Sequence, residues 1–385
     1  METIPLSSTL AITGLTSPCP LQRIEACAGG QQVWFEADER ILCPAPEALG
    51  SAFLIPALAR AAFLEMDAAV CSEWSSHLPE IMRIAREWWN YSSSIPRLKT
   101  MASSAHSTGR ETGLCFSGGV DSFYSLLRGK VPVHRLIYIH GFDIRLDDTA
   151  RMSAFEPSLR RVAAETGTQF TLIRTNLRQV PEFSNAMWEH THGGALAAIG
   201  HLMGDCLDTF VISSSYPYSD SHPWGSHFDL DPLWSSERLK IVHYGAEYFR
   251  AEKLRQIADE PLVQANLHVC WVNRSALLNC SRCEKCLRTQ LALASWGKLD
   301  RFTVFDTNVG LADALDCLPR IPNPNHLIVY QGFLTEELAP DVANALERLL
   351  SRSRHACAMD WWKEPLRRLR TRYRKAKRLS PARVP

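Results

Sequence analysis

Residues 113–128 of this chain read GLCFSGGVDSFYSLLR. A short apolar segment typical of a strand, Leu114 to Phe116, leads into a turn with two adjacent glycines, and a run with helical patterning follows directly. Adjacent glycines allow a tight turn in which backbone N–H groups converge, and the helix that starts there adds the positive end of its dipole. The stretch therefore predicts an anion-binding loop. Its residues are Ser117, Gly118, Gly119, Val120, Asp121 and Ser122.

The side chains of this loop indicate which anion it binds. Ser117 and Ser122 can donate hydroxyl hydrogen bonds to phosphate oxygens, whereas Asp121 would repel a bare phosphate and suits a ligand of accompanying Mg²⁺. The chain has no G-x-x-x-x-G-K-[ST] motif, and no G-x-G-x-x-G follows a predicted strand, which excludes the two common nucleotide-binding loops. We therefore expect a magnesium nucleotide in a different kind of loop.

The residues after this loop repeat the order strand, turn, helix. Such alternation predicts an α/β fold with a doubly wound parallel sheet, whose ligands lie beyond the carboxyl ends of the strands where the strand order reverses. The predicted strands are 135–140, 170–174 and 209–213, and the predicted helices are 120–128, 150–165 and 193–204.

The residues before position 110 predict a separate α+β domain. A strand is expected at Gln32 to Glu36, with helices at Ser51 to Leu64 and Leu78 to Trp89, and the Ser-rich segment 91–110 has the composition of a linker. The predicted domains are 1–110 (N-terminal domain and linker), 111–260 (nucleotide-binding domain), 261–310 (a small subdomain with a cysteine motif) and 311–385 (C-terminal helices and basic tail).

A second motif lies farther along the chain, where four cysteines have the spacing C-x9-C-x2-C-x2-C. Four thiolates with C-x2-C steps suit a closed tetrahedral zinc site, and an iron–sulfur cluster that uses the same ligands is the alternative. We expect Zn²⁺ as the metal, bound by Cys270, Cys280, Cys283 and Cys286.

The segment SGGVDS at 117–122 resembles the S-G-G-x-D-S signature of the PP-loop (N-type) ATP pyrophosphatases. The resemblance implies a fold like that of the adenine nucleotide alpha hydrolases and cleavage of ATP between the α- and β-phosphates. In that family a substrate oxygen attacks the α-phosphorus, pyrophosphate leaves, and a nitrogen or sulfur nucleophile then attacks the adenylated carbon. ATP and Mg²⁺ are the implied cofactors.

Within that superfamily the cysteine spacing is similar to the zinc site of 7-cyano-7-deazaguanine synthase-like proteins, over roughly residues 111–300. The chain departs from that synthase in its N-terminal 110 residues and its C-terminal extension. It also resembles another branch of PP-loop proteins in HGFD (140–143), WGSH (224–227), DPLWS (231–235) and CEKCLRT (283–289), so the substrate of the synthase is not transferred.

The resemblance also implies roles for residues at the predicted strand ends. The loop after the second strand is expected along the adenosine, and Lys253 stands where related enzymes place a lysine near the leaving phosphates, where a cation stabilises developing charge. The expected nucleotide contacts beyond the 117–122 loop are His140, Gly141, Phe142 and Ser214.

Residues 213–235 form a long segment with no helical or strand period. Such a long loop inside a compact domain is usually functional or disordered, and its aromatic residues argue against disorder. We expect it to bind the substrate, with Tyr216, His222, Trp224, His227 and Asp231 as the candidate contacts.

Cys115 distinguishes two reactions. It precedes Ser117 by two residues on the same face of the predicted strand, where a nearby helix terminus would lower the pKa of its thiol and suit it to carry sulfur. The alternative is a small buried strand residue with no chemical role. Cys206, near the end of a predicted helix, is a weaker second candidate.

Composition limits the class of protein. With 385 residues, 46% of them hydrophobic and 22% charged, the chain reads as an ordinary folded protein without a transmembrane segment or a secretory signal, and we expect a cytoplasmic location. Ten Lys or Arg residues lie between positions 363 and 383. Nucleic acid is therefore expected, if at all, only at this basic tail. Two kinds of partner are left open by the sequence: a second copy of the chain in a homodimer, and a protein that donates ammonia or sulfur.

These features predict an enzyme that adenylates a carboxylate, amide or lactam oxygen of a small heterocyclic or nucleotide-like substrate and then replaces that oxygen with nitrogen. The alternative within enzymes is sulfur insertion. An alternative of another class is a nucleotide sensor or zinc-ribbon interaction protein.

Overall fold

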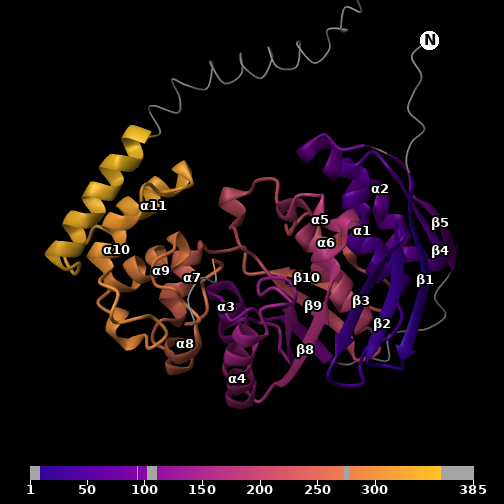
Figure 1. The fold of residues 1–385 in the computed structure, drawn as a ribbon, viewed down its shortest axis with the longest axis horizontal. Coiled ribbons are helices and arrows are strands. Elements are labelled where there is room, and N and C mark those ends of the chain that lie inside the picture. Colours follow the sequence, from indigo (N-terminus) through magenta and orange to yellow (C-terminus); the bar gives the residue numbers. More distant parts are fainter. Residues whose placement is uncertain (1–8, 93, 102–110, 273–276, 357–385) are drawn as a thin grey trace, which may run out of the picture. The chain divides into compact units, whose positions relative to one another are not determined.

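The computed structural model describes residues 9–92, 94–101, 111–272 and 277–356 (Figure 1). They form two compact units, the first ending at His268 and the second starting at Val269. The basic tail at 363–383 lies outside the described residues, as do positions 93 and 102–110 of the predicted linker.

The first unit contains one ten-stranded sheet in the order β10-β9-β6-β7-β8-β3-β2-β1-β4-β5. Most neighbouring strands are parallel, and the antiparallel pairs in the described residues are β1 with β2, β2 with β3, and β3 with β8. The protein is thus α/β with a large, mostly parallel sheet. The strands are β1 Thr9–Cys19, β2 Arg23–Ala28, β3 Gln31–Ala37, β4 Phe63–Cys71, β5 Arg97–Met101, β6 Glu111–Cys115, β7 Arg135–His140, β8 Gln169–Thr175, β9 Leu207–Ser213 and β10 Lys240–Tyr244.

Within the group β6 to β10, every pair of neighbouring strands is parallel, as the alternation of strands and helices predicts. The chain runs from β6 outward through β7 to β8, then returns to place β9 on the other side of β6. The strand order therefore reverses between β6 and β9, directly beside the 117–122 loop.

Two layers of helices cover this part of the sheet. Side chains of successive strand residues point to opposite faces. On β7, Ile137 and Ile139 join the buried cluster that contains α1 and α6, whereas the Tyr138 ring packs edge-on against Phe155 of α4 at 5.5 Å. All six residues of β7 are buried, which explains its continuous apolar pattern.

The helices of the first unit agree with most of those predicted, although α1 ends before position 64 because Phe63 begins β4. They are α1 Pro46–Ala59, α2 Ser72–Trp89, α3 Val120–Arg128, α4 Thr149–Thr166, α5 Pro181–Ser184, α6 Trp188–Leu202, α7 Arg250–Ile257 and α8 Pro261–Asn266, with 3-10 turns η1 Leu177–Gln179, η2 Tyr218–Asp220 and η3 Asp231–Trp234.

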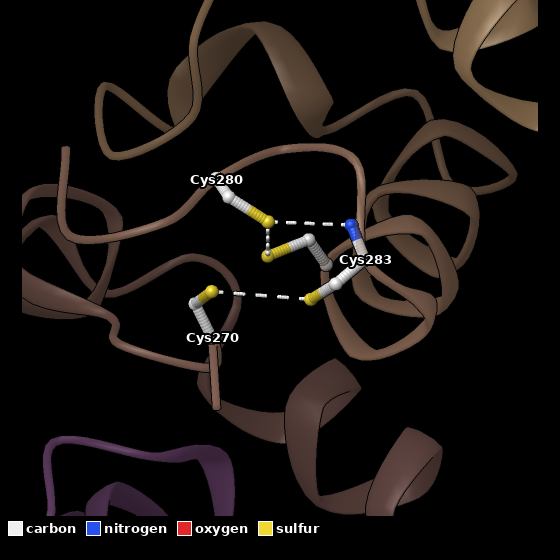
Figure 2. A group of neighbouring side chains, drawn as sticks. Cys270, Cys280 and Cys283 are labelled. Atoms are coloured by element: carbon white, nitrogen blue, oxygen red, sulfur yellow. Dashed lines mark hydrogen bonds between the residues drawn. The ribbon is translucent and has the colours of Figure 1, made fainter. Parts of the chain in front are cut away.

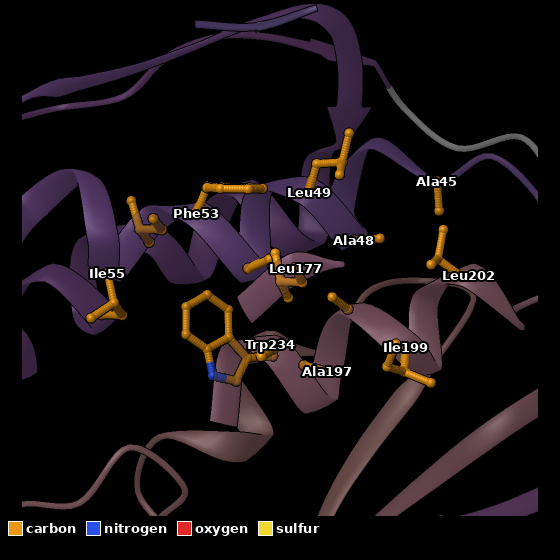
Figure 3. Close-up of a cluster of buried hydrophobic side chains, with 14 of the residues drawn as sticks. Ala45, Ala48, Leu49, Phe53, Ile55, Leu177, Ala197, Ile199, Leu202 and Trp234 are labelled. Carbon is orange, nitrogen blue, oxygen red and sulfur yellow. The ribbon is translucent and has the colours of Figure 1, made fainter. Parts of the chain in front are cut away.

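Helices α1 and α6 pack closely and join the N-terminal residues to the rest of the first unit. A Cβ atom on Gly194 would lie 2.2 Å from the backbone oxygen of Ser51, so only glycine permits this approach. Figure 3 shows the apolar side chains that fill the contact, from Ala48, Leu49 and Phe53 on α1 to Ala197, Ile199 and Leu202 on α6.

The N-terminal strands continue the same sheet through the boundary predicted near residue 110. Strand β3, which the sequence predicts, lies antiparallel to β8, and the side chain of Asn176 bonds the backbone of Trp34 (2.8 Å) and Gln32 (2.9 Å). The linker prediction is wrong at Arg97–Met101, which form β5 beside β4 at the sheet edge.

The second unit is helical. Its elements are α9 Glu284–Ala294, η4 Leu299–Arg301, α10 Leu311–Cys317, η5 Pro324–His326, α11 Leu327–Gln331 and a helix at 340–356. Across both units, none of the helices that the structure describes has the length and apolar character needed to cross a membrane.

Candidate functional site

The loop after β6 has the geometry that its glycines predict. Gly118 adopts a φ of +72°, which favours glycine, and Gly119 is the N-cap residue of α3. The first N–H groups of a helix lack partners inside that helix and are available to an anion. A Cβ atom on Gly118 would also lie 3.0 Å from the Phe155 ring, so bulk is excluded on that side.

The two loop hydroxyls face each other at the start of α3. The Oγ atoms of Ser117 and Ser122 are 3.5 Å apart. The Gly119 N–H donates to Ser117 Oγ at 3.3 Å, and Ser122 Oγ donates to the Gly119 carbonyl at 3.0 Å. Hydroxyl and backbone donors therefore gather at one end of the helix.

Asp121, in the first turn of α3, is held by two cations from α7. Its Oδ2 accepts from Arg250 Nη2 at 2.5 Å, and its Oδ1 accepts from Lys253 Nζ at 3.2 Å. Burial opposes ionisation of this carboxyl, but Arg250 and Lys253 outweigh it and hold the pKa of Asp121 below its usual value. Asp121 is therefore a carboxylate at neutral pH.

Lys253 is almost fully enclosed, with 1% of its surface exposed. Its Nζ donates to the Ser214 carbonyl at 2.6 Å, which joins α7 to the segment after β9. Burial lowers the pKa of Lys253, and Asp121 acts in the opposite direction. The structure thus brings together Asp121, Lys253 and Ser214, which the sequence analysis places in one site.

Arg250 is a member of this cluster that the sequence analysis missed. It stands three residues before Lys253 on α7, and residues three apart share a helix face. That spacing was available in the sequence as a signal for a second cation.

The loop after β7 approaches the end of β8 too closely for a side chain at Gly141. This residue has a φ of +112°, and a Cβ atom there would lie 2.2 Å from the Thr175 oxygen. His140 is buried, its Nε2–H donates to the Arg145 carbonyl (2.9 Å), and burial lowers its pKa. The Phe142 ring is buried and packs edge-on against Trp188 at 5.2 Å. We therefore still predict that the backbone groups of this loop, and not the Phe142 ring, contact adenine.

Of the two alternatives for Cys115, the structure favours the buried strand residue over the thiol with a lowered pKa. Its side chain packs against the cluster on the α6 face of the sheet, and burial, with a smaller contribution from Asp143, raises the pKa of its thiol to about 12. Burial likewise raises the pKa of Cys206 to about 11. Both thiols are therefore protonated at neutral pH, which argues against the alternative of an activated Cys115.

The long loop after β9 divides into two groups of candidate substrate residues. In the first group, Tyr216 packs edge-on against His222 (4.1 Å) and Trp224 (5.5 Å). All three residues are half-buried.

The second group is buried and holds the loop in place. Asp231, with no exposed surface, accepts from Ser226 Oγ at 2.6 Å and contacts His243 Nδ1 of β10 at 2.7 Å. His227 bonds Ser221 Oγ through Nε2 at 2.8 Å, and burial lowers its pKa. These contacts give His227 and Asp231 a role in loop conformation.

The four predicted cysteine ligands meet in the second unit, where their Sγ atoms all lie within 4.8 Å of one another. Cys270 Sγ lies 3.9 Å from Cys283 Sγ, and Cys280 Sγ lies 4.0 Å from Cys286 Sγ (Figure 2). Tetrahedral Zn²⁺ with Zn–S bonds of about 2.3 Å separates its sulfurs by about 3.8 Å. Thiols at these positions therefore suit zinc.

Hydrogen bonds to side chains fix the loops that carry these thiols. Asn279 Oδ1 accepts from the Val269 and Cys270 N–H groups at 2.9 and 3.2 Å, and the Cys283 N–H donates to Cys280 Sγ at 3.3 Å. Cys286 lies on α9, where Gln290 Nε2 donates to its carbonyl at 3.3 Å. No disulfide joins the cysteines of the described residues.

In comparisons with known proteins, no family model, curated protein or solved structure matches this chain.

Proposed function

We propose that the first unit is an AMP-forming ATP pyrophosphatase of the PP-loop type, with a doubly wound sheet like that of the adenine nucleotide alpha hydrolases. The observation that carries the proposal is Asp121 held between Arg250 and Lys253 in the first turn of α3. This cluster stands at the carboxyl end of β6, beside the reversal of strand order, where α/β sheets of this kind bind ligands.

The charges of the cluster suit a nucleotide triphosphate. The hydroxyls of Ser117 and Ser122 and the free N–H groups of α3 would hold phosphate oxygens. Arg250 and Lys253 would stabilise the negative charge that develops on departing pyrophosphate. Asp121 is ionised and offers the oxygen ligands that Mg²⁺ prefers, and bound Mg²⁺ would neutralise phosphate charge. Both carboxylate oxygens contact cations in this structure, so phosphate would have to draw Arg250 and Lys253 away from Asp121.

The proposed reaction has two steps. An acceptor oxygen attacks the α-phosphorus, the bond to the bridging oxygen breaks, and pyrophosphate leaves. A nitrogen nucleophile then attacks the adenylated carbon, and AMP leaves with the former acceptor oxygen. The acceptor is a small heterocyclic or nucleotide-like molecule, and the four-cysteine cluster has a structural role as a zinc site.

The state of Cys115 favours nitrogen over sulfur as the incoming atom. A persulfide carrier must reach its thiolate form to act as a nucleophile, whereas a thiol with a pKa of about 12 is almost entirely protonated at neutral pH. Adenylation and attack by ammonia require no thiol.

We accordingly expect Cys115→Ser to retain product formation within a few-fold of the unchanged protein, because the substitution removes only packing of a sulfur in β6. Cys206→Ser, at another partly buried thiol of the same unit, is the matched control for packing. A Cys115→Ser protein that binds ATP normally but forms no product, beside an active Cys206→Ser protein, would make sulfur insertion the leading function.

The proposed function is tested by incubating the full chain with ATP labelled at the α-phosphate, Mg²⁺, ammonia and a panel of small heterocyclic acids, amides and lactams. We expect AMP and pyrophosphate in equal amounts with at least one acceptor, and a product whose mass shows oxygen replaced by nitrogen. Release of ADP and phosphate, or nucleotide binding without turnover across the panel, would contradict the proposal.

A further inference from the structure

Half-buried aromatic residues form a continuous series at the carboxyl edge of the sheet, on the face covered by α6. The Trp188 and His192 rings of α6 lie 5.7 Å apart, and His192 lies 5.5 Å from Trp224 of the loop after β9. Trp224 in turn contacts Tyr216 and His222. We call these five residues the aromatic wall; each of them is half-buried.

Arg178, in η1 after β8, adds a cation to one end of the aromatic wall. Its guanidinium stacks over the Trp188 ring at 4.2 Å, and its Nη1 donates to the Phe142 carbonyl at 2.6 Å. Stacking and this hydrogen bond fix the plane of the guanidinium, which has further N–H donors besides Nη1.

Within the part of the chain that the structure describes, no carboxylate forms an ion pair with Arg178, although Asp143 and Glu189 lie near enough to favour its charged form. Burial has the larger effect and lowers the pKa of this guanidinium. By contrast Arg160, which also stacks on a ring (Phe170, 4.9 Å), is paired with Glu156.

We propose that Arg178 and the aromatic wall bind the end of the acceptor remote from the reacting oxygen, and that this end is a planar ring bearing an anionic group, a phosphate or a carboxylate. The inference rests on the proposed function, which places the reacting oxygen at the loop after β6. Arg178 follows β8, two strands away, and neighbouring strands are about 4.8 Å apart. The end of β8 is therefore about 10 Å from the end of β6, and the anion that Arg178 holds is a second group, distinct from the one adenylated.

The test compares probes that differ only in the anionic group. Guanosine monophosphate is titrated against guanosine, and indole-3-carboxylate against indole, by calorimetry on the full chain with Mg²⁺ and α,β-methylene-ATP present to fill the nucleotide site. We expect the anionic member of at least one pair to bind about tenfold or more tightly than its neutral partner.

Substitutions then assign the preference to Arg178. Arg178→Gln should abolish the difference between the two probes, and Arg178→Lys should keep part of it, since lysine retains the charge without the planar fork. Arg160→Gln is the matched control and should keep all of it. Equal binding of the anionic and neutral probes by the unchanged protein, or an anion preference that survives Arg178→Gln, would overturn the inference. A separate titration of α,β-methylene-ATP with Mg²⁺ precedes these titrations, and failure of that nucleotide to bind would instead count against the proposed function.

Discussion

Replacing Asp121 with Asn should reduce AMP formation by about a hundredfold or more, a loss typical of removing a group that organises charge at a reacting phosphate. The amide keeps the shape of the side chain but cannot act as an anionic metal ligand or fix Arg250 and Lys253 by charge. Initial rates of AMP release from α-labelled ATP measure the effect.

The same substitution should have a smaller effect on folding. Lys253 would lose a charged partner but keep the Ser214 carbonyl, so we expect a loss of about 1–3 kcal/mol in the free energy of unfolding. Because Asp121 raises the pKa of Lys253, that pKa should fall further in the variant. Asp147→Asn, at an exposed carboxylate paired with Arg145, is the matched control and should leave both measurements unchanged. AMP formation by Asp121→Asn at the rate of the control would disprove the assignment of this site.

The residues around Asp121 show why part of this site could be predicted from the sequence. The glycines, serines and aspartate are contiguous, and the predicted strand and helix fix their orientation without distant contacts. Lys253 required knowledge of a family, and Arg250 required attention to helical spacing. Arg178 had no local signal, because its position over Trp188 depends on how η1 and α6 pack.

Among the N-terminal strands, too, some features could be predicted from local sequence and others could not. Strand β3 has an evident apolar alternation, and Gly29-Gly30 between β2 and β3, with φ values of +56° and +85°, is a hairpin signal that the sequence analysis did not use. Strand β5 contains Arg97 and Lys99 and has no apolar run, so pairing with β4 determines its structure. Local sequence could not reveal that the sheet continues across position 110, because β3 meets β8 only in the folded chain.

The four-cysteine cluster leads to the other prediction with a large expected effect. The purified protein should contain about one zinc per chain, and Cys283→Ser should remove it. Metal binding and folding are coupled in sites of this kind, where the apparent binding free energy is about 10–16 kcal/mol. We therefore expect the second unit of the variant to become sensitive to protease while the first unit, whose sheet has its own buried core, stays resistant.

Cys317→Ser is the matched control for this experiment, because Cys317 is an exposed thiol of α10 in the same unit and lies outside the cluster. It should retain zinc and protease resistance. If elemental analysis found iron, the zinc assignment would be wrong, and the four thiols would instead hold an iron–sulfur cluster. Absence of any metal, or unchanged protease resistance of Cys283→Ser, would contradict the prediction that the four thiols bind a structural metal, despite their sulfur separations of 3.9 and 4.0 Å. The second unit would then have to be stable through its helical packing alone.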